Sequence, residues 1–224
     1  MEHTRRAMLS GVAAGGVVGV TGCLGGSGGS GGDGGNSLET GEYGCELTEP
    51  SDPDLEYRPT LGDPEADVVV RAFEDFTCPH CATYKLEHFP AVREEFVASG
   101  EIRYEHWDFP IPVNETWAVP VASAARGVGE RAGDEAFFEF SSAAYESQGD
   151  YDGPTLGAAA EAAGADPCAA IADAQFSTYE EASMDDRDEG ESMGVSGTPT
   201  IFVNGEAVDG YDSGAIIDAI ESAL

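Results

Sequence analysis

The segment Cys-Pro-His-Cys at residues 78–81 constrains the fold more than any other feature, because it stands where a strand pattern gives way to a helix pattern. Residues 67–76 include three consecutive valines, which favour a strand covered on both faces of a sheet. Residues 79–99 carry apolar side chains at roughly helical spacing and predict a helix with a kink at Pro90. Cys78 would therefore stand at a helix N-terminus, where unpaired backbone N–H groups stabilise a thiolate.

A second strand is predicted at residues 101–109, where Ile102, Tyr104 and His106 occupy alternate positions. Strand, helix and strand at this length form a βαβ unit, so the two strands should run parallel. Residues 115–189 are rich in alanine, and apolar side chains recur there at helical spacing. Glycine and proline divide this stretch into about four predicted helices.

After the helical stretch the sequence returns to strands. Residues 199–203 predict a third strand and residues 206–209 a fourth, joined by an Asn-Gly dipeptide that is typical of tight hairpin turns. Residues 213–224 place several apolar side chains on one helical face and predict a final helix, capped by Asp212 or Ser213. The predicted order is that of an α/β protein.

Two motifs give this pattern a specific resemblance. One is Asp-Phe-Thr-Cys-Pro-His-Cys at residues 75–81, and the other is Val-Ser-Gly-Thr-Pro-Thr-Ile-Phe-Val-Asn-Gly at residues 195–205. With the order β-α-β, helical insertion, β-β-α, they resemble the DsbA-like thiol:disulfide oxidoreductases over about residues 58–224. The resemblance implies an α/β, thioredoxin-like fold in a domain at residues 41–224, with an α-helical insertion at about residues 113–190.

The resemblance also implies a chemistry for the segment between strand and helix. A substrate thiolate would attack Cys78, a mixed disulfide would form, and a second substrate thiol would resolve it. Cys81 would re-form the disulfide with Cys78 when an oxidant recharges the pair. Pro79 and His80 would favour an oxidising disulfide, with His80 adding a charge-assisted contact to the thiolate. The alternatives are a reductase or isomerase, and a non-catalytic lipoprotein that binds a solute or partner on the same scaffold.

The second motif is implied to bind substrate. In the family the proline before the third strand is cis and lies against the cysteines, as Pro199 would, while the backbone of Thr198 would pair with an extended substrate. The family places an acidic residue six positions before the first cysteine, whereas this chain has Ala72 there. Glu74 has the same strand parity and could accept a proton instead. Alternatively, Glu74 is solvated and proton transfer involving Cys81 uses water.

Residues 1–23 resemble a twin-arginine export signal that ends in a lipobox, with the paired arginines at 5–6 and Val-Thr-Gly-Cys at 20–23. In that pattern Cys23 is lipidated and becomes the first residue of the mature protein. The alternative is an ordinary signal peptide with an incidental cysteine. Residues 24–40 are predicted to be a flexible tether, because eight of the first twelve are glycine. We therefore expect a lipid-anchored, exported protein on the outer face of the cytoplasmic membrane.

Of the five cysteines, Cys45 and Cys168 lie outside both the redox segment and the lipobox. In an exported protein such a pair can be bridged, which would staple the segment before the fold to the helical insertion. Two free thiols, or exchange with residues 78–81, are the alternatives. A zinc site formed by residues 78–81 with His88 and His106 is a further alternative, but the spacing does not repeat a metal knuckle. We expect no metal and no cofactor beyond the redox-active disulfide.

The charge of the chain restricts its partners. There are 43 acidic and 10 basic residues, a formal net charge of −33, and Lys85 is the single lysine. We expect no nucleic-acid partner, because such binding needs cationic groups that neutralise phosphates. The acidic excess resembles proteins of extreme halophiles, and with the export pattern the chain resembles an exported haloarchaeal lipoprotein; a generally acidic protein is the alternative. The expected partners are exported proteins with cysteine thiols, and a membrane or small-molecule oxidant that recharges the disulfide.

Overall fold

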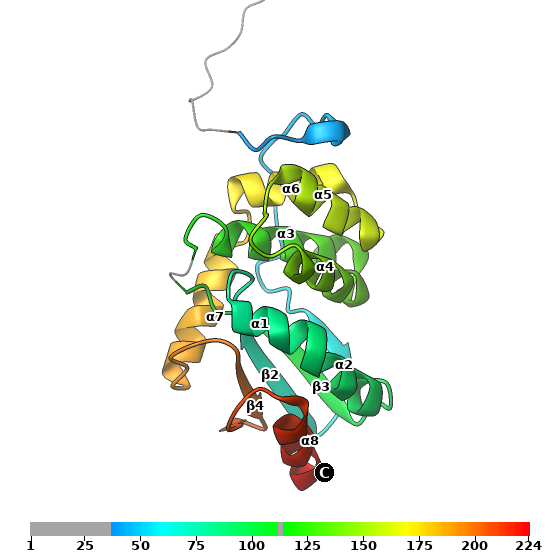
Figure 1. Cartoon of the computed structure of the whole chain (residues 1–224), viewed down its shortest axis with the longest axis vertical. Helices are drawn as coiled ribbons and strands as arrows, with labels where there is room; N and C mark the ends of the chain where they lie inside the picture. The colour runs from blue at the N-terminus through cyan, green and yellow to red at the C-terminus, as the bar shows by residue number, and fades with distance from the viewer. Residues whose placement is uncertain (1–36, 112–113) are drawn as a thin grey trace, which may run out of the picture. The chain divides into compact units, whose positions relative to one another are not determined.

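A central sheet organises the protein in the computed structural model, which describes residues 37–111 and 114–224 (Figure 1). The predicted signal at residues 1–23 and the predicted tether up to residue 36 lie outside the described residues. The described strands are β1 (Thr60–Gly62), β2 (Val68–Glu74), β3 (Ile102–Asp108), β4 (Thr200–Val203) and β5 (Glu206–Ala207). Within these two ranges, we find no helix with the length and apolar character needed to cross a bilayer.

The five described strands form one sheet in the order β1-β3-β2-β4-β5. β2 and β3 pair in parallel, as the βαβ pattern predicts, with Val68 opposite Ile102 and Glu74 opposite Asp108. β4 runs antiparallel on the other side of β2, and β5 forms the short edge beyond it. β1 pairs antiparallel with β3 and is absent from the sequence prediction, because three residues are too few to show a strand period.

The helix after β2 is continuous but irregular. α1 (Pro79–Thr83) and α2 (Phe89–Val92) alternate with two π-helical segments, η2 (Tyr84–His88) and η3 (Arg93–Val97). The sequence predicts a kink at Pro90, and the structure shows a π-helical segment just before it. Proline has no N–H to donate to the preceding turn, so the hydrogen-bond ladder changes its spacing there. In Figure 1 this helix lies over one face of β2 and β3.

The insertion contains five helices in the part of the chain that the structure describes, one more than predicted. They are α3 (Ala118–Ala132), α4 (Asp134–Glu146), α5 (Gly153–Ala162), α6 (Pro167–Phe176) and α7 (Glu180–Ser192). The first four pack on one another beside the sheet, whereas α7 packs against β3 and α3 (Figure 1). The additional break falls at Ser177, whose φ of 49° ends α6. Neither glycine nor proline marks this break, so the helical pattern in the sequence continues across it.

The C-terminal part has the predicted hairpin and helix. Asn204 and Gly205 have positive φ values of 48° and 83°, which suit a tight turn between antiparallel strands. β5 ends at Ala207, earlier than predicted. α8 (Ser213–Ala223) begins after Asp212, whose carboxylate accepts a backbone N–H of the first turn. α8 contacts α2, β2 and β4, so it covers the same face of the sheet as α2.

The segment before β1 is joined to the helical insertion. The sulfurs of Cys45 and Cys168 lie 2.00 Å apart, so the structure holds these cysteines as a disulfide between this segment and α6. The Leu38 N–H donates to Gln175 Oε1, also in α6, at 2.5 Å. The sequence leaves open whether Cys45 and Cys168 are bridged or free, and the structure has them bridged. That the bridge forms in the exported protein stays a prediction.

Candidate active site

The cysteine pair lies at the carboxyl end of β2, where the chain turns into α1. Cys78 is the N-cap of α1, and the backbone N–H groups of Cys81 and Ala82 donate to its carbonyl oxygen at 3.0 and 3.2 Å. Both cysteines are free thiols. Cys78 exposes 3% of its surface and Cys81 exposes none, so an incoming group reaches Cys78 first. The structure thus shows the strand-to-helix position expected from the sequence.

The two thiols differ in acidity. A hydrogen bond from the Cys81 thiol lowers the pKa of Cys78 to about 5, against the effect of partial burial, and hydrogen bonds from the Cys81 and His80 backbones assist. Burial raises the pKa of Cys81 well above its usual value, and the negative charge of Glu74 raises it further. At neutral pH Cys78 is therefore a thiolate and Cys81 a thiol.

The ring of His80 is hydrogen-bonded to Tyr211, a residue that the sequence alone does not indicate. His80 Nδ1 lies 3.0 Å from the hydroxyl of Tyr211, which is in the loop before α8. The backbone N–H of His80 supports the Cys78 thiolate. Nothing local in the sequence indicates Tyr211, because the two residues are 131 positions apart. The expected charge-assisted contact between the His80 ring and Cys78 stays a prediction.

Thr198, which precedes Pro199, lies against Cys78. Their peptide bond is cis, the isomer that the family resemblance implies. Cys78 Sγ lies 3.3 Å from the Thr198 carbonyl oxygen, to which it donates as a thiol. Thr198 Oγ1 is buried and has no hydrogen-bond partner in the described part of the chain. Two motifs that are 120 residues apart therefore meet at Cys78.

The helical insertion holds the loop that carries Cys78. Gln148, just after α4, donates through Nε2 to the carbonyl oxygens of Phe76 and Cys78 at 2.8 and 3.0 Å. The Tyr151 hydroxyl donates to the same Phe76 oxygen at 2.8 Å. These bonds fix the backbone between β2 and α1 from the side of the insertion. The sequence does not reveal them, because each links residues at least 70 positions apart.

The acidic side chain beneath the pair is Glu74. Glu74 exposes 1% of its surface, so the solvated alternative is wrong, and Ala72 is buried without a charge. Glu74 Oε1 lies 3.2 Å from His106 Nδ1 and 3.5 Å from Lys85 Nζ. Burial alone would raise the pKa of Glu74, but Lys85 and His106 outweigh it and hold this pKa below its usual value. Glu74 is therefore a buried carboxylate.

The single lysine of the chain is buried beside this carboxylate. The Lys85 side chain has no exposed surface, and its ammonium lies 4.6 Å from the ring centroids of both Phe89 and Phe138. Burial lowers the pKa of Lys85, and the attraction of Glu74 acts in the opposite sense. The sequence cannot indicate this burial, because lysines on helices are mostly exposed.

The zinc alternative requires His88 and His106 to meet the cysteine segment. Instead, the two ring nitrogens of His106 lie next to Glu74 and Asp108. The His88 ring packs against Tyr211 with a centroid distance of 6.1 Å. Across residues 37–111 and 114–224, no three histidine, cysteine or acidic side chains are grouped as metal ligands would be.

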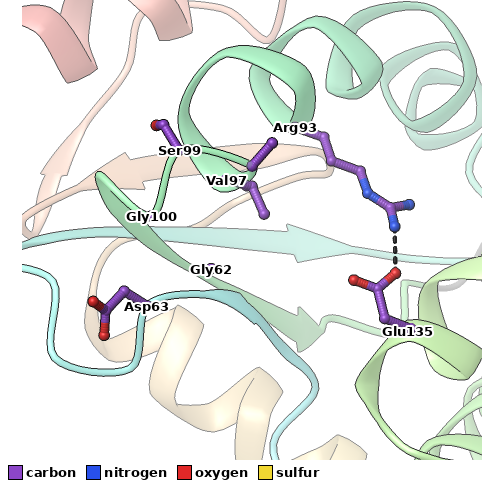
Figure 2. A pocket seen from close by; sticks show the side chains of 8 residues that line it. Gly62, Asp63, Arg93, Val97, Ser99, Gly100 and Glu135 are labelled. Carbon is purple, nitrogen blue, oxygen red and sulfur yellow. Dashed lines mark hydrogen bonds and ion pairs between the residues drawn. The ribbon is translucent and has the colours of Figure 1, made fainter.

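A surface cavity of about 550 Å³ lies elsewhere on the protein (Figure 2). Its lining includes Gly62 in β1 and Gly100 just before β3, so it is at the opposite end of β3 from the cysteine pair. Arg93 and Glu135 form an ion pair at this cavity, as Figure 2 shows. Neither cysteine nor histidine lines it, so it is not the site of thiol exchange.

The fold and the cysteine site agree with the known family that the chain matches. The family model described as thioredoxin matches residues 54–221, so the chain belongs to the thioredoxin family. Among solved structures, it is similar to oxidised BdbD from Bacillus subtilis, with a TM-score of 0.67, 23% identity, and coverage of 80% of this chain and 98% of that one. It is also similar to DsbA from Chlamydia trachomatis, with a TM-score of 0.66, 22% identity, and coverage of 75% and 91%. The predicted thioredoxin-like fold with a helical insertion is confirmed.

Curated relatives fall into two kinds. Na(+)/H(+) antiporter NhaA 1 of Salinispora arenicola is 33% identical over 190 residues, which cover 80% of this chain and 26% of the antiporter. The chain thus spans about a quarter of the length of that relative. Disulfide bond formation protein D of Bacillus subtilis is 25% identical over 179 residues, which cover 77% of this chain and 79% of that protein.

Proposed function

We propose that this protein is a thiol:disulfide oxidoreductase that forms disulfide bonds in exported proteins through Cys78 and Cys81. The observation that carries the proposal is the environment of Cys78. Its acidic thiol lies at the start of α1, 3.3 Å from the carbonyl oxygen of Thr198, and Thr198 precedes a cis proline. The similarity to a relative named disulfide bond formation protein D supports the same activity.

The reaction starts from a Cys78–Cys81 disulfide. A substrate thiolate attacks Cys78 Sγ, the new sulfur–sulfur bond forms, and the electron pair of the broken bond leaves on Cys81. A second substrate thiolate attacks the substrate sulfur of this mixed disulfide, and Cys78 leaves as a thiolate. The substrate has then lost two electrons and carries a disulfide, and the enzyme is a dithiol, the form that this structure shows. An external oxidant must return the dithiol to the disulfide.

The direction of exchange follows from the stability of the Cys78 thiolate. The hydrogen bonds that lower the pKa of Cys78 stabilise its thiolate, which exists only in the reduced enzyme. They therefore stabilise the reduced form relative to the disulfide form. A pair whose reduced form is stabilised is an oxidant, because electrons flow into it from ordinary protein thiols. The geometry therefore favours oxidation of substrates over their reduction.

Substrate binding would use the backbone around Thr198. Its carbonyl oxygen lies beside Cys78, and an extended peptide can pair with such a backbone group as a strand does. Pro199 contributes no N–H, so the pairing would depend on Thr198. This mode recognises the main chain, which suits an enzyme that acts on cysteines in many exported proteins.

We also propose that the domain at residues 41–224 is exported and held at the membrane by a lipid on Cys23. The signal pattern at residues 1–23 and the glycine-rich tether at residues 24–40 support this location. The disulfide between Cys45 and Cys168 would join the segment that follows the tether to the helical insertion. A membrane-bound or small-molecule oxidant on the same side would recharge the enzyme.

Refolding of a reduced protein with several cysteines tests the activity. The full chain, first oxidised and assayed in molar salt, should accelerate disulfide formation and recovery of the native substrate. Cys78→Ser should abolish the acceleration, whereas Ser99→Ala, in the turn that follows the same helix, should retain it. Equal rates with wild type and Cys78→Ser would contradict the enzyme and leave a binding protein on this scaffold.

A further inference from the structure

The loop between β5 and α8 reaches the segment between the two cysteines and brings a tyrosine to it. This residue is Tyr211, and its hydroxyl oxygen lies 3.0 Å from Nδ1 of His80 in α1. The centroids of the two rings are 5.9 Å apart. The exchange steps described above assign no role to this contact. Because His80 lies between Cys78 and Cys81 in the chain, the contact can act on the redox pair.

The loop that carries Tyr211 is anchored on both sides of it. Before Tyr211, the backbone N–H of Val208 donates to a carbonyl oxygen of β4 at 2.9 Å. After Tyr211, the carboxylate of Asp212 accepts a backbone N–H of α8 at 3.1 Å and caps that helix. Gly210 has a φ of 106°, a conformation open mainly to glycine, and lets the chain turn there. The backbone therefore holds Tyr211 where its hydroxyl meets His80.

The ring of Tyr211 is held separately from its hydroxyl. It packs against the main hydrophobic core and is only partly exposed. It also contacts the ring of His88 in η2, with a centroid distance of 6.1 Å. These contacts involve the ring and do not require the oxygen. The substitution Tyr211→Phe therefore removes the hydrogen bond to His80 and keeps the packing of the loop.

One ring nitrogen cannot serve two hydrogen-bond partners. Nδ1 of an imidazole carries either a proton or a lone pair, and a tyrosine hydroxyl can accept from the first or donate to the second. In both cases Tyr211 occupies Nδ1 of His80. This nitrogen then has no proton left to donate to the sulfur of Cys78.

The sulfur of Cys78 has other partners in the reduced enzyme. Its thiolate is stabilised by the Cys81 thiol and by the backbone N–H groups of Cys81 and His80. As a thiol it donates to the carbonyl oxygen of Thr198. Within residues 37–111 and 114–224, no hydrogen bond joins either ring nitrogen of His80 to this sulfur. The contact that the sequence predicts between ring and thiolate thus competes with Tyr211 for the same ring.

We propose, on the basis of the function above, that Tyr211 is a positioning residue that holds the His80 ring off the Cys78 sulfur and so moderates the oxidising power of the pair. In the disulfide form there is no thiolate, and the ring stays on Tyr211. In the dithiol form, which this structure shows, the ring is also on Tyr211. Without the hydroxyl the ring is free to bond to the thiolate, which stabilises the dithiol alone and makes the disulfide a stronger oxidant.

The strength of the bond to Tyr211 limits the size of the effect. The ring of His80 lies on the tyrosine in the reduced enzyme, so its contact with the thiolate cannot be worth more than the bond that it would replace. A hydrogen bond between neutral groups changes an equilibrium constant by about fivefold. Removal of the Tyr211 hydroxyl should therefore shift the redox equilibrium by up to about fivefold.

Equilibration of the full chain with glutathione in molar salt measures this shift. Two glutathione thiols reduce the Cys78–Cys81 disulfide to the dithiol and become one glutathione disulfide, so atoms and electrons balance. Tyr211→Phe should move the equilibrium toward the dithiol by about fivefold, which is about 20 mV for a two-electron couple. Tyr57→Phe removes a hydroxyl that donates to Asp134 at 2.8 Å, outside the active site, and should leave the potential as in wild type. An unchanged or less oxidising Tyr211→Phe would overturn the proposal.

A double variant shows whether Tyr211 acts through the histidine. In a His80→Ala background, Tyr211→Phe should leave the potential unchanged, because there is no ring to release. A shift that persists in this background would overturn the proposal and indicate a general effect of the substitution on the loop. A wild-type potential near that of thioredoxin would instead contradict the proposed function. The difference between wild type and Tyr211→Phe still decides the role of Tyr211 in that case, so the two failures are distinguishable.

Discussion

Cys78 and Cys81 are one helical turn apart, but their surroundings differ in every respect that matters for exchange. Cys78 faces the Thr198 carbonyl oxygen at the rim of the sheet, and hydrogen bonds lower its pKa to about 5. Cys81 faces the interior, where burial and Glu74 raise its pKa. One sulfur is thus suited to attack and to leave as a thiolate, and the other to remain protonated until the disulfide re-forms. The comparison shows that the surroundings, more than the C-x-x-C spacing, assign these roles.

The largest expected effect comes from removing the buried member of the pair. Cys81→Ser should leave the attack of the Cys78 thiolate on a substrate disulfide intact but remove the thiol that would displace the substrate, so mixed disulfides should accumulate when the variant is mixed with disulfide-bonded proteins. Cys78→Ser should form none, because the remaining thiol is buried and protonated. Non-reducing mass spectrometry after acid quenching measures both. Equal trapping by the two variants would contradict the different roles of the two sulfurs.

Cys45 and Cys168 provide an internal reference for the accessibility of Cys78 to alkylation. If Cys45 and Cys168 are bridged as in the structure, alkylation without reductant should leave both unlabelled. Cys78 should be labelled under the same conditions once the active-site disulfide has been opened by a mild thiol. Peptide mass spectrometry reads all of these positions, and label on Cys45 and Cys168 in untreated protein would contradict the bridge.

Breaking the buried charge pair should have a large effect on stability. Lys85→Met removes the ammonium next to a fully buried Glu74 and should lower the free energy of unfolding by about 3 to 5 kcal/mol. The double variant Lys85→Met with Glu74→Gln should recover much of this loss, because no unpaired charge is left. Denaturant unfolding in molar salt measures both variants.

The surface ion pair of Arg187 with Glu191 provides the matched control for that experiment. Both side chains are partly exposed, so Arg187→Met should lower the unfolding free energy by at most about 1 kcal/mol. A Lys85→Met variant as stable as Arg187→Met would show that the pair beneath Cys81 is not a buried charge pair.

The acidity of Cys78 predicts a pH dependence of stability. Its pKa is about 5 in the folded reduced protein, and about 8.5 is usual for an unfolded chain. A lowered pKa stabilises the folded state fully above the unfolded value, and this contribution is lost as the pH falls toward 5. The unfolding free energy of the reduced protein, relative to Cys78→Ser, should therefore rise between these two pH values. An equal slope in both proteins would indicate an ordinary thiol.

The smallest effect is expected where the insertion holds the active-site loop. Tyr151→Phe removes one neutral hydrogen bond to the Phe76 carbonyl oxygen and should cost about 1 kcal/mol of stability. Gln148→Ala removes two such bonds and should cost more, while the secondary structure is retained. Thermal unfolding of both variants measures the difference. Full stability of Gln148→Ala would show that the insertion does not hold the loop.

Local patterns account for what the sequence predicts correctly. The valine-rich strand, the cysteines at the helix start and the Asn-Gly hairpin each depend on residues close together in the chain. The two sequence motifs identified Thr198 as a neighbour of Cys78 through the family resemblance. The break at Ser177 escaped prediction because neither glycine nor proline marks it.

The parts that escaped prediction depend on distant contacts. Tyr211 reaches His80 across 131 residues, and Gln148 reaches Cys78 across 70. The sequence leaves the burial of Glu74 undecided, because strand parity places it on the face of Ala72 without indicating what covers that face. In the sequence Lys85 is an ordinary helix lysine, and only the rings of Phe89 and Phe138 around its ammonium account for its burial.

The reduction potential of the Cys78–Cys81 pair tests the central claim most directly. It can be measured by equilibrating the full chain with glutathione buffers of known composition in molar salt. A stabilised Cys78 thiolate predicts an oxidising potential, above about −200 mV. A value near about −270 mV, as in thioredoxin, would contradict the account and indicate a reductase.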